Sequence, residues 1–167
     1  MDTHQQPVWQ AYPVQVLFID FDGVLHPEFC HESQHFMHRD SFEAILRAFP
    51  KMDVVISSTW RLKRQLPELK ALFSEDVAER VIGLTPLYAE LENIPDRLVG
   101  YEREAECLAW LQRHDRASQS WRALDDRSWS LRPFNRNVFL SDGHARLDAD
   151  VASRSRDRLA LTKRKFG

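Results

Sequence analysis

Continuous apolar runs alternate along the chain with segments whose apolar residues recur every three or four positions. Residues 14–19 and 53–57 are mostly apolar, which is typical of strands buried on both faces of a parallel sheet. Between them, residues 41–49 place their apolar side chains on one helical face: Phe42, Ile45, Leu46 and Phe49. Pro50 ends this predicted helix, because proline lacks the amide that a further turn requires.

The second half of the chain continues this alternation. We expect short strands at 80–86, 121–126 and 137–141. Helices are expected from about Pro67, over 103–114 and over 149–161, with a loop over 87–102. Strands that alternate with helices predict an α/β fold, in which right-handed crossovers join the strands of a mostly parallel sheet.

Composition adds few constraints. The 167 residues are 43% hydrophobic and 29% charged, and the net charge of −2 argues against general electrostatic binding to nucleic acid, although a local basic patch stays open. Cys30 and Cys107 do not make a disulfide framework, and we find neither a signal peptide nor a membrane-spanning apolar run. We therefore expect a cytoplasmic protein with no membrane partner, of unknown oligomeric state. We divide the chain into a lead-in at 1–13, a single domain at 14–160 and a basic tail at 161–167.

Two carboxylates, Asp20 and Asp22, and then Gly23 follow the first apolar run. Residues i and i+2 of an extended segment point to the same side, so the two side chains start out together, and Gly23 permits a sharp turn after them. Ligands bind beyond the carboxyl ends of strands in open α/β sheets. Adjacent carboxylates repel unless a cation neutralises them, and Mg²⁺ prefers such oxygen ligands. Taken alone, however, the pair favours a plainer explanation, a strand cap or a partner for arginine.

Polar side chains end two other expected strands as well. Ser57 and Ser58 follow the second apolar run, where a hydroxyl can donate to a phosphate oxygen, although serine after a strand is usually turn chemistry. Asp125 and Asp126 end the strand at 121–126, and either a metal site or a helix N-cap would explain them. Parallel strands would bring all of these groups to one edge of the sheet.

The order of these motifs resembles the haloacid dehalogenase (HAD) superfamily of phosphohydrolases. The resemblance spans roughly residues 14–142, and "ISSTWR", "IGLTP" and "ALDD" are similar to the small HAD domains related to bacterial RNA-repair proteins. It implies a Rossmann-like three-layer sandwich that acts as a Mg²⁺-dependent phosphatase. About 34 residues separate Asp22 from Ser57, which leaves room for little or no cap domain.

The resemblance implies a role for each matching residue. Asp20 would be the nucleophile that takes the phosphoryl group as an aspartyl-phosphate. Asp22 would protonate the leaving oxygen and then activate water, and family members that act as ATPases carry Thr at this position. Ser57 would bind the phosphate, with Ser58 as the alternative, and Gly23 is expected beside the same phosphate.

The resemblance also implies a magnesium site. Asp126 would be the more direct ligand among the acidic pair at the later strand, with Asp125 in support. Asp20 and the backbone carbonyl of Asp22 would complete the protein ligands.

A Lys or Arg must offset the charge of the phosphate and the nucleophile in this family. Arg103 opens the helix before the "ALDD" strand, which is the expected location. Arg61, which could instead hold the substrate, is the rival, and Lys63 is the third candidate.

Several histidines lie between Asp22 and the helix at 41–49. His31 and His35 could share a face and bind zinc if their segment is helical. Because no second group of ligands has matching spacing, we favour a polar flap over the site. Without a cap, the site suits bulky phosphates such as nucleic-acid ends or phosphoproteins, and Trp60 could stack on a base.

Other classes of function stay open. A two-metal nuclease would use Asp20, Asp22 and Asp126 to cut internal phosphodiesters without a covalent intermediate. A catalytically inactive interaction module would keep the fold and lose the dependence on Mg²⁺. A phospho-receiver ranks low, because there the acidic pair ends the first strand and the phospho-accepting aspartate ends a middle one. The motif order favours the phosphatase.

Overall fold

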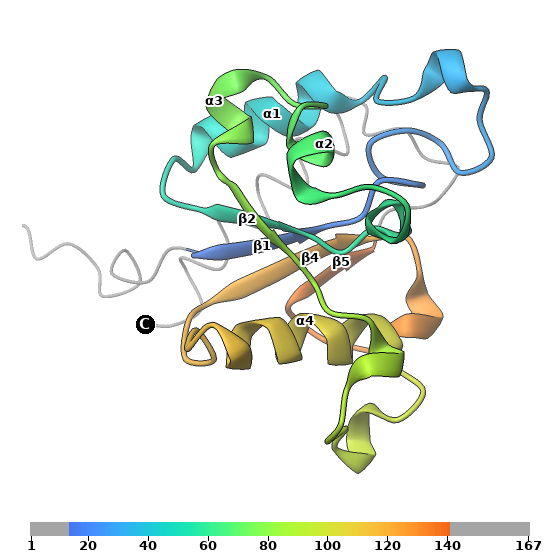
Figure 1. Ribbon diagram of the computed structural model, residues 1–167, viewed down its shortest axis with the longest axis vertical. Coiled ribbons are helices and arrows are strands. Elements are labelled where there is room, and N and C mark those ends of the chain that lie inside the picture. Colours follow the sequence, from blue (N-terminus) through green and yellow to red (C-terminus); the bar gives the residue numbers. More distant parts are fainter. Residues whose placement is uncertain (1–13, 141–167) are drawn as a thin grey trace, which may run out of the picture.

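A parallel sheet of five strands forms the centre of the computed structural model, which describes residues 14–140 (Figure 1). The strands are β1 (Val16–Ile19), β2 (Asp53–Ile56), β3 (Val81–Leu84), β4 (Trp121–Asp125) and β5 (Val138–Leu140). Their order is β3-β2-β1-β4-β5, and every pairing is parallel. The predicted α/β fold is confirmed, and each strand lies within the range expected for it.

The strand order places a switch point next to β1. The chain builds β2 and β3 on one side of β1, and then returns to add β4 and β5 on the other side. At such a point the connections after neighbouring strands diverge to opposite faces of the sheet, which opens a crevice at the carboxyl ends. The crevice between β1 and β4 is therefore where a ligand is expected.

Helices cover both faces of the sheet (Figure 1). One face carries α1 (Arg39–Ala48), α2 (Leu66–Lys70) and α3 (Glu75–Ala78), and the other carries α4 (Glu102–Arg113). The three-layer arrangement is thus confirmed. The sequence did not predict α3, because its four residues make a single turn that shows no periodicity. Within residues 14–140, no helix is long and apolar enough to cross a membrane.

Short 3₁₀ helices occupy much of the remaining chain: Glu32–Gln34, Thr59–Leu62, Tyr88–Glu90, Asp96–Leu98 and Ser128–Ser130. Two of them lie in the segment predicted as a loop at 87–102. The described segments after β1 and β3 hold no additional sheet, which agrees with little or no cap domain. The helix predicted at 149–161 lies outside the described residues.

Successive residues of β1 face opposite layers of the molecule. Leu17 and Ile19 belong to the core shared with α1, α2 and α3, whereas Val16 and Phe18 belong to the core shared with α4. All four side chains are fully buried. Burial on both faces explains why this strand is continuously apolar in the sequence.

Arg80, just before β3, fastens the end of α1 to the sheet. Its guanidinium donates hydrogen bonds to the backbone carbonyls of Leu46, Phe49 and Met52. The carbonyls of Leu46 and Phe49 also accept from backbone amides, so the fork of donors adds hydrogen bonds that join the end of α1 to the segment before β2.

Replacing Arg80 with alanine should therefore lower the free energy of unfolding by about 2–3 kcal/mol, since it removes several hydrogen bonds from a charged donor to partly buried carbonyls. Arg80→Lys should recover only part of this loss, because lysine cannot reach the carbonyls as a planar fork. Urea denaturation would measure both. Arg113→Ala, which truncates an exposed arginine in the last turn of α4, is the matched control and should change stability little. A loss in Arg80→Ala no larger than in this control would contradict the argument.

Candidate active site

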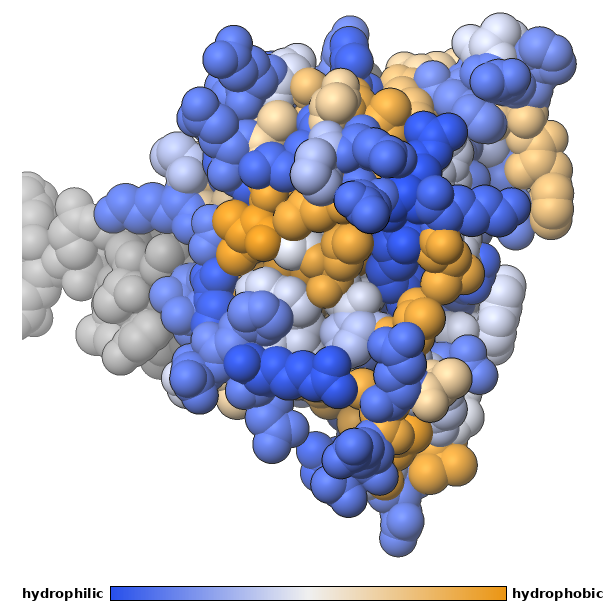
Figure 2. Space-filling view, viewed as in Figure 1, coloured by the Kyte–Doolittle hydropathy of each residue, from blue (hydrophilic) through white to orange (hydrophobic). Residues whose placement is uncertain are grey.

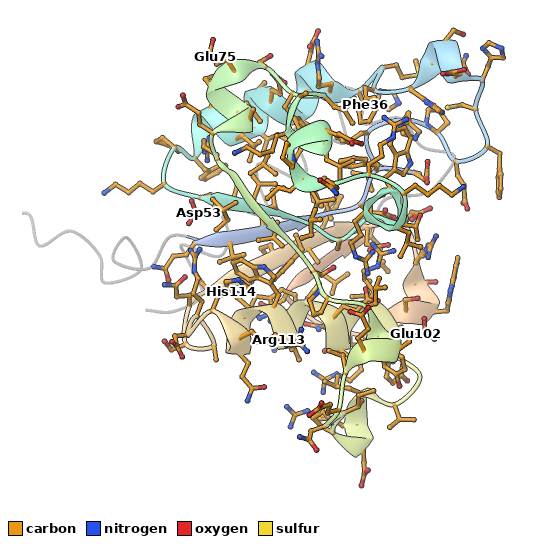
Figure 3. The ribbon with its side chains drawn as sticks, viewed as in Figure 1. Phe36, Asp53, Glu75, Glu102, Arg113 and His114 are labelled. Atoms are coloured by element: carbon orange, nitrogen blue, oxygen red, sulfur yellow. The ribbon has the colours of Figure 1, made fainter. Side chains whose placement is uncertain are left out.

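Three carboxylates meet at the crevice between β1 and β4. Asp20 directly follows β1, and Asp125 and Asp126 end and follow β4. One oxygen of each lies within 4.8 Å of the others. Ile19 pairs with Leu124 in the parallel ladder, so the sheet register itself brings Asp20 beside Asp125. Figure 3 shows nitrogen and oxygen atoms gathered beyond these strand ends, at the right of the sheet.

The cluster holds buried oxygens that lack protein donors. Within the described part of the chain, Asp20 Oδ2, Asp125 Oδ2 and Asp126 Oδ1 accept no hydrogen bond. Burial, followed by the charge of Asp20, raises the pKa of Asp125 to about 7. Burial, contact with Asp20 and the charge of Asp125 raise the pKa of Asp126 to about 8. Three crowded carboxylates fit Mg²⁺, which takes oxygen ligands and offsets their repulsion.

Gly23 is required by the way the chain turns away from this cluster. Its φ of 80° lies in the left-handed region, and its amide donates to the carbonyl of His26 at 2.8 Å. A Cβ at Gly23 would collide with the carboxylate of Asp126. Glycine therefore allows both the turn and the close approach of the two segments.

Arg103, in the first turn of α4, is the cation that lies against the acidic cluster. Its Nη1 is 3.6 Å from Asp20 Oδ1 and 3.5 Å from Asp125 Oδ2, and it donates to the carbonyl of Ser57. Burial opposes the charge, but Asp125 and Asp20 outweigh it and raise the pKa of Arg103. The arginine thus stays charged where it neutralises part of the cluster.

Arg61 is directed into the protein instead. Its guanidinium donates to the carbonyls of Ser57, Ser58 and Thr85 and pairs with Glu106 at 2.8 Å. Burial lowers the pKa of Arg61, and Glu106 opposes this effect. The third candidate, Lys63, is exposed. Of the three cations considered from the sequence, Arg103 is the one placed beside Asp20.

Asp22 lies outside the acidic cluster and has hydrogen-bond donors of its own. Its Oδ1 lies 2.7 Å from His26 Nε2, and Trp60 Nε1 donates to both of its oxygens at 3.2 and 3.3 Å. The backbone N–H of Phe36 donates to His26 Nδ1, so the proton of a neutral His26 belongs on Nε2, which donates to Asp22. The hydrogen bond from His26 lowers the pKa of Asp22, against the effect of burial.

Trp60 is part of an aromatic cluster rather than an open platform. Its ring packs against those of Phe21, Phe36 and His35 at centroid distances of 5.2 to 5.7 Å. The guanidinium of Arg64 lies over the ring, 4.8 Å from its centroid. In this arrangement a stacking base would compete with Arg64.

Ser57 and Ser58 are both buried at the end of β2. The hydroxyl of Ser58 accepts from the amide of Trp60 and so caps the 3₁₀ helix at Thr59–Leu62. Ser57 follows the strand directly, and its amide donates to the carbonyl of Ile19. The preference for Ser57 as the phosphate ligand stays a prediction, and the cap formed by Ser58 agrees with it.

The structure thus brings together Asp20, Asp125, Asp126, Gly23 and Arg103, with Ser57 at the neighbouring strand end. Sequence reasoning did not assign the side chains that contact Arg103 and Asp22, which are Glu106 for Arg103 and His26 and Trp60 for Asp22. Glu106 is three residues after Arg103 on the same helix, a spacing that could have indicated an ion pair. His26 and Trp60 act on Asp22 through a tertiary fold that no local pattern shows.

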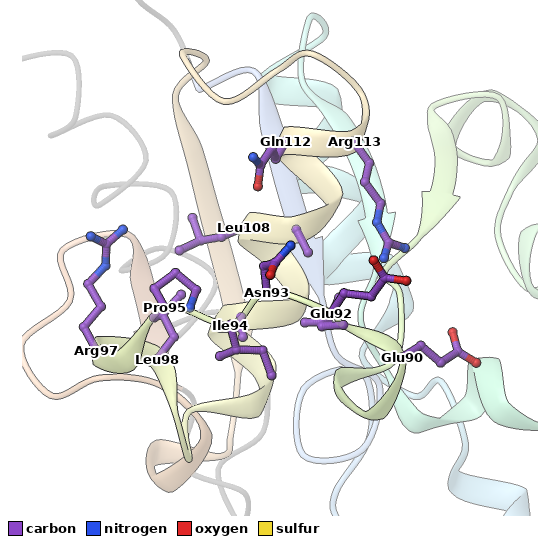
Figure 4. Close-up of a pocket in the computed structure, with 13 residues that line it drawn as sticks. Glu90, Glu92, Asn93, Ile94, Pro95, Arg97, Leu98, Leu108, Gln112 and Arg113 are labelled. Atoms are coloured by element: carbon purple, nitrogen blue, oxygen red, sulfur yellow. The ribbon is translucent and has the colours of Figure 1, made fainter.

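A pocket of about 340 Å³ opens beside Asp22. It is lined by Asp22, His26, Pro27, Glu28, Phe29, Cys30, His35, Asp126 and Arg127. A second pocket of about 360 Å³ lies between α4 and residues 90–98, and shares no lining residue with the first (Figure 4). The first pocket is therefore the one that a substrate of this site would enter.

Comparison with protein families gives one match. A family model described as "HAD domain in Swiss Army Knife RNA repair proteins" matches residues 16–152, which is most of the chain. Neither curated proteins nor solved structures gave a significant match.

The raised pKa values of Asp125 and Asp126 predict how stability depends on pH. Between about pH 4 and pH 8 the folded state holds protons that the unfolded state has lost, so stability without metal should fall as pH rises through this window. Mg²⁺ binds the deprotonated form and should stabilise more at pH 8.5 than at pH 5. At about 100-fold excess over Kd the gain is ~2.7 kcal/mol, or roughly 5–10 °C in Tm.

Thermal unfolding with EDTA or Mg²⁺ at both pH values would measure these effects. Asp126→Asn should flatten the pH dependence and reduce the Mg²⁺ shift, whereas Asp96→Asn, a carboxylate outside the cluster, should behave as wild type. An equal Mg²⁺ shift at both pH values would count against the metal site.

Proposed function

Since the chain belongs to the family of HAD domains in Swiss Army Knife RNA repair proteins, we propose that it is a Mg²⁺-dependent phosphatase that acts through an aspartyl-phosphate on Asp20. Membership supports a HAD-type phosphohydrolase in general. The observation that carries the finer proposal is the environment of Asp20, where one oxygen is held by the protein and the other is buried without a donor.

Asp20 is suited to attack phosphorus. Its Oδ1 accepts from the amide of Phe21 at 2.9 Å and lies near Arg103, which orients the carboxylate. Its Oδ2 remains available to form the new oxygen–phosphorus bond while the bond to the leaving oxygen breaks. Positioning and charge neutralisation are the main contributions that a protein makes to phosphoryl transfer, and Arg103 serves both.

Asp22 would move the protons of both half-reactions. It gives a proton to the leaving oxygen, and then takes one from the water that attacks the aspartyl-phosphate. Its lowered pKa favours the second task. The first task requires a higher pKa, which the negative charge of a phosphate bound nearby would supply. His26 and Trp60 keep the carboxylate pointed to the same place throughout.

Mg²⁺ at this site would bind Asp20, Asp126 and the carbonyl of Asp22, and would offset the charge of the phosphoryl group. Asp125 is suited to a supporting role, because its Oδ1 accepts from the amide of Arg127 and its Oδ2 faces Arg103. The hydroxyl of Ser57 would donate to a phosphate oxygen from the neighbouring strand.

Asp20→Asn should abolish phosphatase activity, because the amide is a poor nucleophile, and EDTA should do the same to wild type. Asp22→Asn should lower kcat by about 10²–10⁴-fold, the usual contribution of general acid–base catalysis. Hydrolysis of an aryl phosphate would measure each rate, and Asp76→Asn, an exposed carboxylate, is the matched control. Substrate turnover in Asp20→Asn at the wild-type rate would refute the mechanism. Acid-quenched labelling by a phosphorylated substrate should mark wild type and spare this variant.

The substrate that we propose is a phosphate monoester at the end of a nucleic acid. The family description names RNA repair, and one exposed aromatic side chain, Phe29, lines the pocket beside Asp22. Phe29 is 94% exposed, and Trp129, 66% exposed, follows the acidic pair by three residues. Arg127 adds a positive charge at the pocket. Aromatic rings and a cation are what an unpaired terminal nucleotide requires.

Phe29→Ala and Trp129→Ala should each raise KM for a phosphorylated oligonucleotide roughly 5- to 100-fold, the value of one stacked base. The rate with an aryl phosphate should change little. Val99→Ala, which removes another exposed apolar side chain, is the control. Wild-type activity should be compared on 3′- and 5′-phosphorylated RNA and DNA. Cleavage of internal phosphodiesters with no release of terminal phosphate would instead favour the two-metal nuclease.

A further inference from the structure

The segment between β1 and α1 gathers three metal-binding side chains of a different kind. His26, Cys30 and His35 each offer one ligand atom, and these atoms lie within 4.8 Å of one another. This segment projects from the body of the molecule at the upper right of Figure 1, and apolar and hydrophilic groups mix on it in Figure 2. None of the three residues belongs to the acidic cluster at the strand ends.

These two imidazoles and one thiol prefer a different ion from the carboxylates of Asp20, Asp125 and Asp126. Nitrogen and sulfur ligands select Zn²⁺ and similar ions, whereas carboxylates select Mg²⁺. Bonds of about 2.0–2.3 Å set ligand atoms roughly 3.4–3.8 Å apart in a tetrahedral zinc site. Closing the cluster around an ion thus requires movements of about an ångström or less within one loop.

The hydrogen bonds of His26 already match those of a metal ligand. Its Nε2 donates to Asp22, and its Nδ1 carries a lone pair that now accepts from the amide of Phe36 at 3.2 Å. A histidine that ligates a metal through one nitrogen usually donates from the other nitrogen to a carboxylate. An ion at Nδ1 would replace the longer of the two hydrogen bonds and keep the one to Asp22.

The backbone next to the thiol is in an unusual conformation. Phe29, directly before Cys30, has a φ of 58° while its side chain is almost fully exposed, so no packing offsets the cost of the left-handed region. Phe36, directly after His35, has a φ of 61°. The two strained residues flank the two partly buried ligands, and His35 stacks on His26 at 4.7 Å.

The two ligands that are partly exposed also reach solvent. Cys30 and His35 line the pocket beside Asp22, so water can supply a fourth ligand. Glu28 and Phe29 lie in the same wall of this pocket. An ion that holds Cys30 to His26 and His35 would therefore also hold Glu28 and Phe29 in the position where a substrate would contact them.

We propose that His26, Cys30 and His35 form a second metal site, which takes a thiophilic divalent ion such as Zn²⁺ with water as fourth ligand and holds the pocket wall in place. From the sequence, zinc binding in this segment is considered for His31 and His35 as a helical pair. In the structure the helical part is only the 3₁₀ turn Glu32–Gln34, and His31 Nδ1 is engaged with Ser33. His26 and Cys30, rather than His31, therefore lie beside His35.

Cobalt binding tests this proposal without reference to phosphatase activity. The full chain is titrated with Co²⁺ in excess Mg²⁺, and the near-ultraviolet absorption of a thiolate–cobalt bond is recorded. One equivalent should produce the band, and Zn²⁺ should remove it. Cys30→Ser should abolish the band, and His35→Ala should weaken Co²⁺ affinity at least about 10-fold.

His31→Ala is the matched control in the same loop and should bind as wild type. Asp126→Asn should also keep the band, so that loss of the proposed Mg²⁺ site and loss of this one are told apart. Circular dichroism of each variant establishes that it is folded. Absence of the band in wild type, or its persistence in Cys30→Ser, would overturn the proposal.

Discussion

The crowding of three carboxylates at one point of the sheet edge is the constraint around which this molecule is arranged. The parallel register of β1 and β4 places Asp20 beside Asp125, and Asp126 follows at once. Buried carboxylates that repel each other would destabilise the fold unless positive charge offsets them. Arg103 supplies part of that charge from within the chain. The remaining oxygens without donors leave room for a cation.

The placement of α4 follows from this requirement as much as from its apolar face. Trp110 and Leu111 pack the helix against the sheet, while Arg103 in its first turn reaches the carboxylates. One turn further on, Glu106 pairs with Arg61, whose other donors bind the strand-end carbonyls. Arg103, Glu106 and Arg61 thus each have a partner of opposite sign.

The sequence predicted the features that depend on residues close together in the chain. Apolar runs located all five strands, and the polar residues after them indicated the active edge, because both features depend on neighbouring residues in the chain. What it missed depends on contacts between distant segments. The donors to Asp22 come from a turn four residues on and from the segment after β2, and neither spacing has a pattern. Helical spacing pointed to His31, but this segment folds as a loop with positive φ at Phe29 and Phe36.

Asp20 and Asp22, at the end of the same strand, are suited to different tasks because different side chains surround each of them. Asp20 lies among carboxylates and an arginine, where its charge is needed to bind a cation and to attack phosphorus. Asp22 lies beside the donors His26 and Trp60, at 35% exposure, where a proton can reach it from solvent. The sharp turn at Gly23 produces this difference, because it directs the chain back so that His26 returns to the strand end. A proton carrier beside a nucleophile that binds the cation is the arrangement that the two steps of the proposed reaction require.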